Sequence, residues 1–129
     1  MIRTAEAAGY KGIILTSGTG DVYSPKVVRA AAGSLFRMPV LNAGDSGEAV
    51  ELIRRMGKKI TVTCPDNGIN CFEADMVSDT ALVIGNEGRG VSRGFMENAD
   101  IKVKIPMAGS IESLNAAVAA GILMYQSQR

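Results

Sequence analysis

The stretch that decides the fold is Ala81-Leu82-Val83-Ile84-Gly85-Asn86-Glu87-Gly88-Arg89-Gly90, an apolar run that ends in a glycine-rich turn. Four consecutive apolar residues, 81–84, predict a strand covered on both faces, as in parallel sheets. In open α/β sheets, ligands bind at the carboxyl ends of strands, where glycine lets the backbone approach a ligand closely. The alternative is a tight strand-to-helix turn without a ligand, and this stretch alone does not decide between the two.

Similar short apolar runs alternate with helical patterns along the rest of the chain. Further strands are predicted at 12–15, 38–41, 59–63 and 101–105, the last with the period-two alternation of a half-exposed strand. Helices are predicted at 24–35, 46–56, 92–98 and 112–126, and residues 2–9 look like the end of another helix. The alternation predicts an α/β fold with a mostly parallel sheet and helices on both faces.

A second glycine-containing loop, 105–115, connects the last predicted strand to the last helix. Ser110 or Ser113 is a candidate N-cap, which would place free N–H groups and the positive end of the helix dipole at this loop. Capping does not explain Asn115, which the pattern places inside the first turns of an apolar helix. That helix is rich in Ala and Gly on nearly every face, so we expect it to be buried and closely packed.

The composition excludes several classes of enzyme. The chain of 129 residues fits a single domain, and it contains no histidine and only two cysteines, Cys64 and Cys71. Ser-His-Asp and Cys-His catalysis and a structural zinc site are therefore excluded within one chain, and no metal is expected. We expect two buried free thiols. Because the N-terminus has no long apolar segment and the apolar run 116–125 is too short to span a bilayer, we expect a soluble cytoplasmic protein.

The charge distribution is uneven although the net charge is only +1. Residues 1–64 carry nine Lys and Arg against five Asp and Glu, and residues 65–129 carry five against eight. Such an imbalance can create one basic face. The alternative is a set of ordinary solvated helices.

The familiar nucleotide-binding fingerprints are absent from the sequence. Gly88-x-Gly90-x-x-x-Gly94 misses the G-x-G-x-x-G spacing of a dinucleotide-binding protein by one residue, and no phosphate-binding G-x-x-x-x-G-K-[ST] occurs. A Rossmann-like NAD-binding protein is therefore the least favoured hypothesis.

Three segments taken together resemble the motifs of one family. IRTAEAAG (2–9), LVIGNEGRGVS (82–92) and IPMAGSIESLNAAVAAGILMYQ (105–126) resemble the three motifs of the SpoU/TrmH branch of the SPOUT RNA 2′-O-ribose methyltransferases. The resemblance covers essentially the whole chain. It implies a SPOUT fold, in which the C-terminal segment passes through a loop to form a trefoil knot, an exception to the rule that chains do not thread.

The resemblance also implies a cofactor, S-adenosyl-L-methionine, held mainly by backbone groups of three loops. Carried over by motif, the cofactor-binding residues are Thr63, Gly85, Ile105, Met107 and Leu114, with Leu114 in the helix after the third loop. The glycines are expected to let the cofactor lie flush against the backbone.

The implied reaction is methyl transfer to a ribose 2′-hydroxyl of rRNA or tRNA. Arg3 matches the motif 1 arginine that family members use in catalysis; because its pKa lies above about 12, we expect it to position phosphate and the developing alkoxide rather than to act as a base. The remaining expected catalytic residues, which orient the substrate or Arg3, are Asn86, Glu87, Ser113 and Asn115. A homodimer is implied, and Arg29, Arg37 and the Arg54–Lys59 cluster are candidates for RNA phosphate contacts.

The chain departs from the family pattern at its first residue. The family's motif 1 begins with an Asn-x-Gly segment after a strand, and this sequence starts partway through the motif. We therefore expect residues 1–129 to be a SpoU/TrmH-type methyltransferase domain without its first strand and without the RNA-recognition domain. The alternative is a non-catalytic dimeric remnant that binds RNA or cofactor.

Overall fold

The structure is a computed structural model that describes residues 1–76 and 79–128. Its helices are α1 (Ile2–Ala7), α2 (Pro25–Ala31), α3 (Ser34–Arg37), α4 (Ser46–Arg55), α5 (Arg93–Glu97) and α6 (Ala116–Gln126). Its strands are β1 (Ile13–Leu15), β2 (Val40–Asn42), β3 (Lys59–Thr63), β4 (Ile69–Asn70), β5 (Thr80–Val83) and β6 (Ile101–Lys104).

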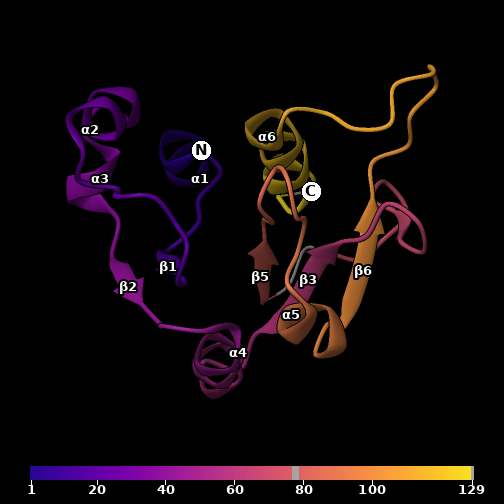
Figure 1. Cartoon of the computed structure of the whole chain (residues 1–129), viewed down its shortest axis with the longest axis horizontal. Coiled ribbons are helices and arrows are strands. Elements are labelled where there is room, and N and C mark those ends of the chain that lie inside the picture. Colours follow the sequence, from indigo (N-terminus) through magenta and orange to yellow (C-terminus); the bar gives the residue numbers. More distant parts are fainter. Residues whose placement is uncertain (77–78, 129) are drawn as a thin grey trace.

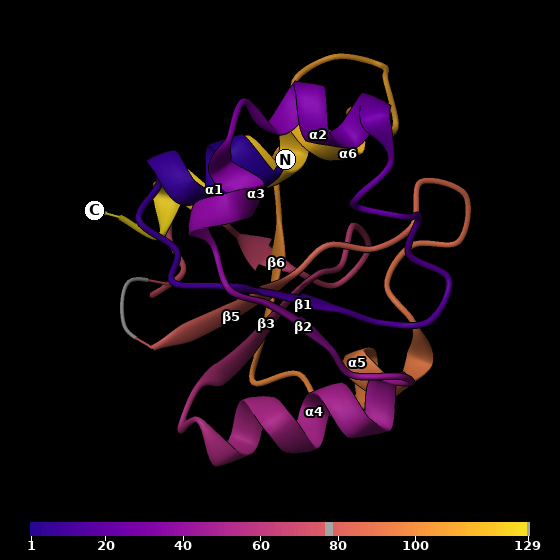
Figure 2. The same ribbon diagram turned by 90° about the vertical axis from the view of Figure 1, so that its left-hand side faces the viewer.

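Parallel strands lie between two helical layers, as the sequence predicts. In Figure 2, α4 and α5 cover one face of the strands, and α1, α2, α3 and α6 cover the other. Every strand pairing is parallel. The prediction of an α/β fold with parallel strands and helices on both faces is confirmed.

The prediction of one sheet is wrong for the described residues. The strands form a β1-β2 pair and a separate sheet in the order β4-β6-β3-β5. Parallel strands pair only where their backbones approach to about 4.8 Å, and Figure 1 shows β1 and β2 set apart from β5. The hydrophobic pattern predicted every strand except β4 (Ile69–Asn70), but it could not predict which strands approach this closely.

The predicted helix 24–35 is two helices. Ser24 caps α2, because its side chain accepts a hydrogen bond from the Val27 N–H, and Pro25 takes the first helical position. The chain then leaves the helix at Ala32 (φ 49°) and Gly33 (φ 86°), both left-handed, and α3 begins directly afterwards. Consecutive left-handed residues cannot continue a right-handed helix, so α2 and α3 point in different directions.

The last helix begins at Ala116 and not at 112. Asn115 is its N-cap, and its Oδ1 accepts hydrogen bonds from the N–H groups of Ala117 (2.9 Å) and Val118 (3.3 Å). Neither Ser110 nor Ser113 caps the helix. The cap is Asn115, the residue that the sequence pattern had placed inside the helix. The helix is also not buried on all faces, because Val118 and Tyr125 are each 54% exposed.

The loop between β3 and β5 contains a short strand that the sequence did not reveal. In β4, Ile69 pairs with Val103 and Asn70 pairs with Lys104 of β6. Gly68 allows this approach, because a Cβ at that position would lie 2.5 Å from the Cys64 carbonyl oxygen. Of the two cysteines, Cys71 is buried as expected, whereas Cys64 is only half-buried. No helix among the described residues is long and apolar enough to cross a bilayer.

Candidate active site

The ends of three neighbouring strands bring the predicted cofactor-binding loops to one edge of the sheet. β3 lies between β5 and β6. Thr63, the last residue of β3, pairs with Val103 of β6. Ile105 comes two residues after Val103, so it lies just past the end of β6 and close to the end of β3. Val62 pairs with Val83, which places Gly85 at the same edge on the other side of β3. Adjacent strands are about 4.8 Å apart, so Thr63, Gly85 and Ile105 lie side by side across roughly two strand spacings.

Gly85 begins a tight turn that closes on itself. The Gly90 N–H donates to the Asn86 carbonyl (2.7 Å), and the Asn86 N–H donates to the Gly90 carbonyl (3.1 Å). A Cβ at Gly85 would lie 2.3 Å from the carbonyl carbon of Gly90. The turn itself therefore requires glycine here, as the alternative of a tight strand-to-helix turn predicts.

The polar residues of this turn have different tasks. The Asn86 Oδ1 accepts hydrogen bonds from the N–H groups of Gly88 (2.8 Å) and Arg89 (3.2 Å), so the Asn86 side chain helps to shape the turn. Glu87 is exposed next to it, and no hydrogen bond or ion pair of its carboxylate is found in the described part of the chain. Of the two, Glu87 has the side chain that is available to a substrate.

The second loop, 105–115, is exposed and carries unusually accessible apolar side chains. Met107 is 39% exposed, Ile111 70% and Leu114 36%. Leu114 lies just before α6 and not inside the helix, which corrects its predicted place. Ser113 is also exposed on this loop. Exposed apolar side chains beside a strand edge suit a ligand with an apolar ring.

One hydrophobic cluster joins all three motifs. Its buried residues are Ala5, Ala8, Met38, Ala120 and Met124, and Leu82 and Ile84 pack against them. Side chains from α1 (motif 1), from the end of β5 (motif 2) and from α6 (motif 3) therefore all contribute to this cluster. The Tyr10 hydroxyl and the Ser127 hydroxyl, 2.9 Å apart, add a polar link between the same two ends of the chain. Segments that are distant in sequence are therefore held as one unit.

Arg3 projects from α1 next to a cavity of about 390 Å³. The cavity is lined by Met1, Ile2, Arg3, Lys26, Val27, Ala30 and Ala31. Arg3 is exposed and forms no ion pair with a described residue. No hydrogen bond or ion pair between described residues joins Arg3 to Glu87 or Ser113. The motif segments that carry these residues pack on the shared cluster.

Glu6, one turn after Arg3, fixes α1 to α3. Its carboxylate accepts hydrogen bonds from the Arg37 guanidinium (2.5 and 2.8 Å) and from the Ser34 hydroxyl. The Arg37 hydrogen bond, helped by Ser34, lowers the pKa of Glu6 to about 2. Sequence reasoning missed this interaction, because residues 28 and 31 positions apart give no local signal.

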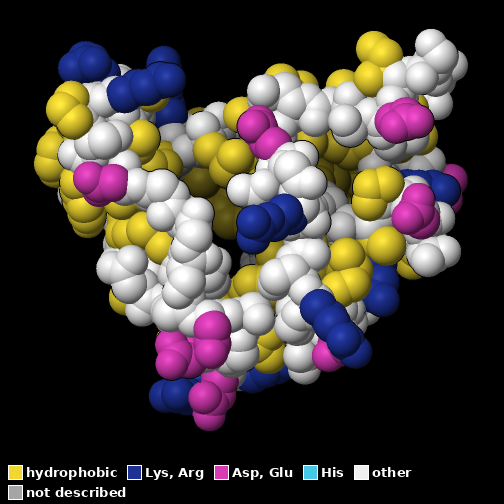
Figure 3. Space-filling model, viewed as in Figure 1, with side chains coloured by type: hydrophobic (Ala, Val, Ile, Leu, Met, Phe, Trp, Pro, Cys, Tyr) yellow, Lys and Arg dark blue, Asp and Glu magenta, His cyan; other side chains and the backbone are white. Residues whose placement is uncertain are grey.

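Most of the arginines and lysines expected to bind RNA are already paired. Arg37 pairs with Glu6, Arg54 with Asp100 (2.5 Å), Arg55 with Glu51 (4.0 Å) and Lys58 with Asp79 (3.6 Å). In contrast, Arg3, Lys26 and Arg29 have no ion pair within 1–76 and 79–128. Figure 3 shows Lys and Arg side chains gathered over α2, at the upper left. Arg3 and Lys26 line one cavity and Arg29 lies on the same helix as Lys26, so unpaired cations gather at α1 and α2. Lys59 also has no ion pair with a described residue, and RNA contacts by Arg37 and 54–59 stay a prediction.

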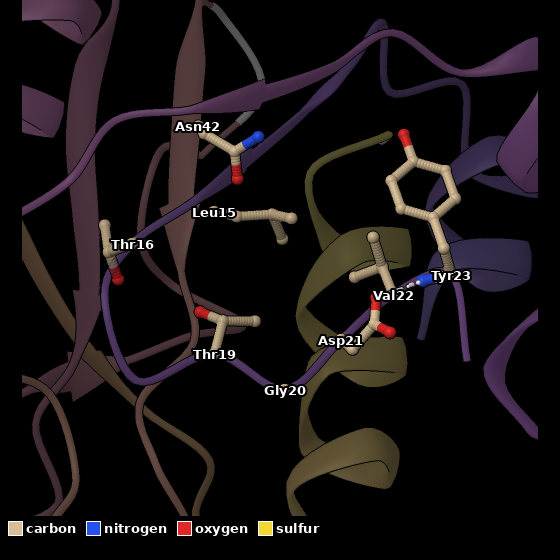
Figure 4. A pocket seen from close by; sticks show the side chains of 8 residues that line it. All are labelled: Leu15, Thr16, Thr19, Gly20, Asp21, Val22, Tyr23 and Asn42. Carbon is tan, nitrogen blue, oxygen red and sulfur yellow. Dashed lines mark hydrogen bonds between the residues drawn. The ribbon is translucent and has the colours of Figure 1, made fainter.

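A second cavity, of about 230 Å³, was not predicted from the sequence. It lies where β1 and β2 end, and its lining residues are Leu15, Thr16, Thr19, Gly20, Asp21, Val22, Tyr23 and Asn42 (Figure 4). The only available signal was the turn-rich stretch 16–21 directly after a strand. That pattern predicts a loop but does not predict a cavity.

The sequence matches a known protein family over nearly its whole length. The family model described as the SpoU rRNA Methylase family matches residues 1–125. The chain belongs to the SpoU family. This membership replaces the NAD-binding alternative, and it agrees with the close packing of the three motif segments on one cluster.

Curated SpoU relatives are similar over nearly all of this chain. The 23S rRNA (guanosine(2553)-2′-O)-methyltransferase of Bacillus subtilis is 40% identical over 125 residues, which are 97% of this chain and 50% of the relative. The 23S rRNA (uridine(2479)-2′-O)-methyltransferase of Streptomyces viridochromogenes is 41% identical over 134 residues, covering 100% of this chain and 47% of the relative. The chain thus spans about half the length of these relatives.

Solved structures of SpoU proteins share the fold. The Streptomyces viridochromogenes SpoU methyltransferase AviRb, in complex with the cofactor AdoMet, matches with a TM-score of 0.89 and 38% identity over 98% of this chain and 52% of that one. The AdoMet-bound rRNA methyltransferase of Sinorhizobium meliloti matches with a TM-score of 0.91 and 34% identity, over 98% and 49%. No cluster of three or more His, Cys, Asp or Glu side chains suited to a metal ion occurs in the described ranges.

Proposed function

We propose that this protein methylates a ribose 2′-hydroxyl of rRNA or tRNA with S-adenosyl-L-methionine. The observation that carries the proposal is the packing of α1, the end of β5 and α6 on one cluster, because these elements hold the three SpoU motifs. The relatives' names describe RNA 2′-O-methyltransferases, which favours an enzyme over a non-catalytic remnant. Residues 1–129 are proposed to belong to the methyltransferase domain.

The proposed cofactor site is the strand edge formed by Thr63, Gly85 and Ile105. The residues present fit S-adenosyl-L-methionine, because this edge offers backbone groups from two loops, and the exposed side chains of Met107 and Leu114 offer apolar surface for an adenine. When bound, the cofactor supplies a methyl group on a sulfonium, which needs little further activation.

The protein's own side chains are proposed to prepare the ribose hydroxyl. A hydroxyl is a poor nucleophile, so it must be held in line and its developing negative charge stabilised. Arg3 is exposed and unpaired among the described residues, which suits a guanidinium that holds a phosphate and the nascent alkoxide. Glu87 and Ser113 are exposed and orient the substrate. Asn86 and Asn115 act mainly through the turn and the helix cap that they form.

RNA is proposed to bind over α1 and α2. Arg3 and Lys26 line the same cavity, and Arg29 lies exposed on the same helix as Lys26. Unpaired cations gain more from phosphate contacts than cations already held by carboxylates, because no existing pair must be broken. This is why the paired Arg37 and Arg54 are not part of the proposed RNA surface.

The homodimer and the trefoil knot belong to the proposal as well. Val118 and Tyr125 on α6 are both half exposed, so this helix has an apolar face available to a second copy of the chain. For the knot, the support is the connection 105–115, which carries the chain from β6 across to α6, where Leu123 packs with Leu82 and Val103. Figure 1 shows this connection extending away from β6 before it returns to α6.

Calorimetry with S-adenosyl-L-methionine tests the cofactor site. We expect a micromolar Kd, about −8 kcal/mol, for the unaltered chain. Gly85→Ala should abolish binding, because its Cβ would meet the backbone of Gly90 at 2.3 Å. Gly88→Ala is the matched control, since its nearest neighbour would be the Asn86 Oδ1 at 3.4 Å. The absence of heat with the unaltered chain would reject the proposed site.

Methyl transfer to RNA tests the role of Arg3. We expect Arg3→Ala to reduce the rate by about 10²–10³-fold, as when one group that stabilises a developing oxyanion is removed. Its affinity for S-adenosyl-L-methionine should stay unchanged, because Arg3 is not at the strand edge. The rate is measured by mapping 2′-O-methyl groups in rRNA and tRNA. An Arg3→Ala protein that methylates at the normal rate would refute the assigned role.

A further inference from the structure

The cavity at the ends of β1 and β2 has the polarity of a recognition site. Leu15 lies at the centre of the view in Figure 4, with Asn42, Thr16 and Thr19 around it and Tyr23 on the far side. The Asn42 amide and the two threonine hydroxyls are donors and acceptors that form no hydrogen bond with described residues. An apolar floor ringed by available hydrogen-bonding groups is typical of a site for a small polar ring.

The charges of the lining exclude a phosphate as the occupant. No Lys or Arg lines the cavity, and its one charged residue is Asp21. One carboxylate oxygen of Asp21 accepts a hydrogen bond from the Tyr23 N–H at 2.9 Å, which keeps the negative charge at the rim. A carboxylate repels phosphate but accepts hydrogen bonds from the N–H groups of nucleobases.

The size and the aromatic side chain favour one nucleobase. The volume of about 230 Å³ is below the roughly 300–1,000 Å³ of pockets that enclose whole ligands, so a single ring system fits and a complete cofactor does not. Tyr23 is 61% exposed, which leaves its ring available for stacking. RNA-binding proteins commonly stack unpaired bases on exposed aromatic rings while polar groups contact the base edges.

The position of the cavity relates it to the proposed RNA surface. Leu15 and Val22 of its lining belong to a cluster that also contains Ile2, the neighbour of Arg3, and Val27, the neighbour of Lys26. The cavity lined by Arg3 and Lys26 and the β1–β2 cavity, which has no Lys or Arg, therefore rest on one set of packed side chains. A nucleotide needs both kinds of site, one for its phosphate and one for its base.

We propose that the β1–β2 cavity binds one nucleobase of the RNA substrate, either that of the methylated nucleotide or that of a direct neighbour. Tyr23 stacks on the base, while Asn42 and Asp21 contact its edge. The inference rests on the proposed function and deepens it, because it assigns base recognition to residues outside the three motifs.

A double-mutant cycle between protein and RNA tests this inference. The protein is the full 129-residue chain with its demethylated cofactor product, and the ligand is an RNA that the unaltered chain methylates. Single abasic nucleotides replace, in turn, the methylated nucleotide and its two neighbours. At one of these positions, we expect the abasic change and Tyr23→Ala each to weaken binding roughly tenfold, as for the loss of one stacked base. Combined, they should weaken binding no more than either alone.

The control is Phe36→Ala, which removes another exposed aromatic ring from outside the cavity. Its effect should be small and independent of the abasic position. If the effects of Tyr23→Ala and the abasic change multiply to about a hundredfold at all three positions, the inference is overturned. A failure of methyl transfer by the unaltered chain would instead reject the proposed function, so the two failures are distinct.

Discussion

Two buried hydroxyl groups, those of Thr61 and Ser34, differ in whether they have a hydrogen-bond partner. Thr61 is completely buried in β3, and its Oγ1 has no hydrogen-bond partner in the described structure. Ser34 is equally buried, but its hydroxyl donates to Glu6. A buried unpaired hydroxyl costs free energy, whereas a paired one contributes to stability.

We expect Thr61→Val to raise the free energy of unfolding by about 1 kcal/mol, because it replaces an unpaired hydroxyl with a methyl group of similar size. Ser34→Ala, the matched change at a paired hydroxyl, should lower it by a similar amount. Urea denaturation of the three proteins measures both differences. A less stable Thr61→Val protein would mean that the hydroxyl has a partner after all.

Among the elements, α1 depends on long-range contacts. It has only six residues, and short helices are marginal in isolation. Its buried Ala5 and the Ala8 that follows it pack in one cluster with Ala120 and Met124 of α6, and its Glu6 reaches the Arg37 and Ser34 side chains of α3. The helix that carries Arg3 is therefore oriented by an ion pair as well as by packing.

This ion pair makes the stability of the α1–α3 contact depend on pH. Arg37 and Ser34 lower the pKa of Glu6 from 4.5 to about 2. A lowered carboxylate pKa contributes stability that is fully present above the unfolded value and is lost as pH falls toward the folded value. The stability difference between the unaltered chain and Glu6→Gln should therefore be constant above pH 5 and shrink between pH 5 and 2, as denaturation at each pH measures. Glu51→Gln, at an exposed 4.0 Å pair, should show little such change.

At the scale of the whole molecule, pairing redistributes the charge. The carboxylates of Glu6, Glu51, Asp79 and Asp100 neutralise most of the basic residues that the sequence offered for RNA. Arg3, Lys26 and Arg29 have no ion pair with a described residue and gather at α1 and α2. A protein with a net charge of only +1 thereby gains a local basic surface.

Salt dependence of RNA binding tests this surface. Each phosphate contact adds about 0.7 to the slope of log K against log salt for single-stranded RNA. Lys26→Ala should lower the slope by about that amount. Lys102→Ala makes the same charge change on β6, across the molecule from α2 (Figure 1), and should leave the slope unchanged. Equal effects of both variants would contradict a surface centred on α2.

The sequence by itself determined the local structure and the family. Apolar runs located the main strands, apolar periodicity located α2 and α4, and three motifs indicated the SpoU family that the comparison confirmed. These features were predictable because each depends on residues that are close along the chain. The roles assigned to Arg3, Glu87 and the cofactor-binding residues stay predictions.

Only the tertiary structure decided which residues are free to act. It divided the strands into two sheets, paired Arg37 with Glu6 and opened the cavity beside Tyr23. These outcomes depend on side chains that meet across tens of residues. Local sequence patterns carry no information about these long-range contacts. The free energy of each contact between side chains is set by their distance and burial in the folded chain.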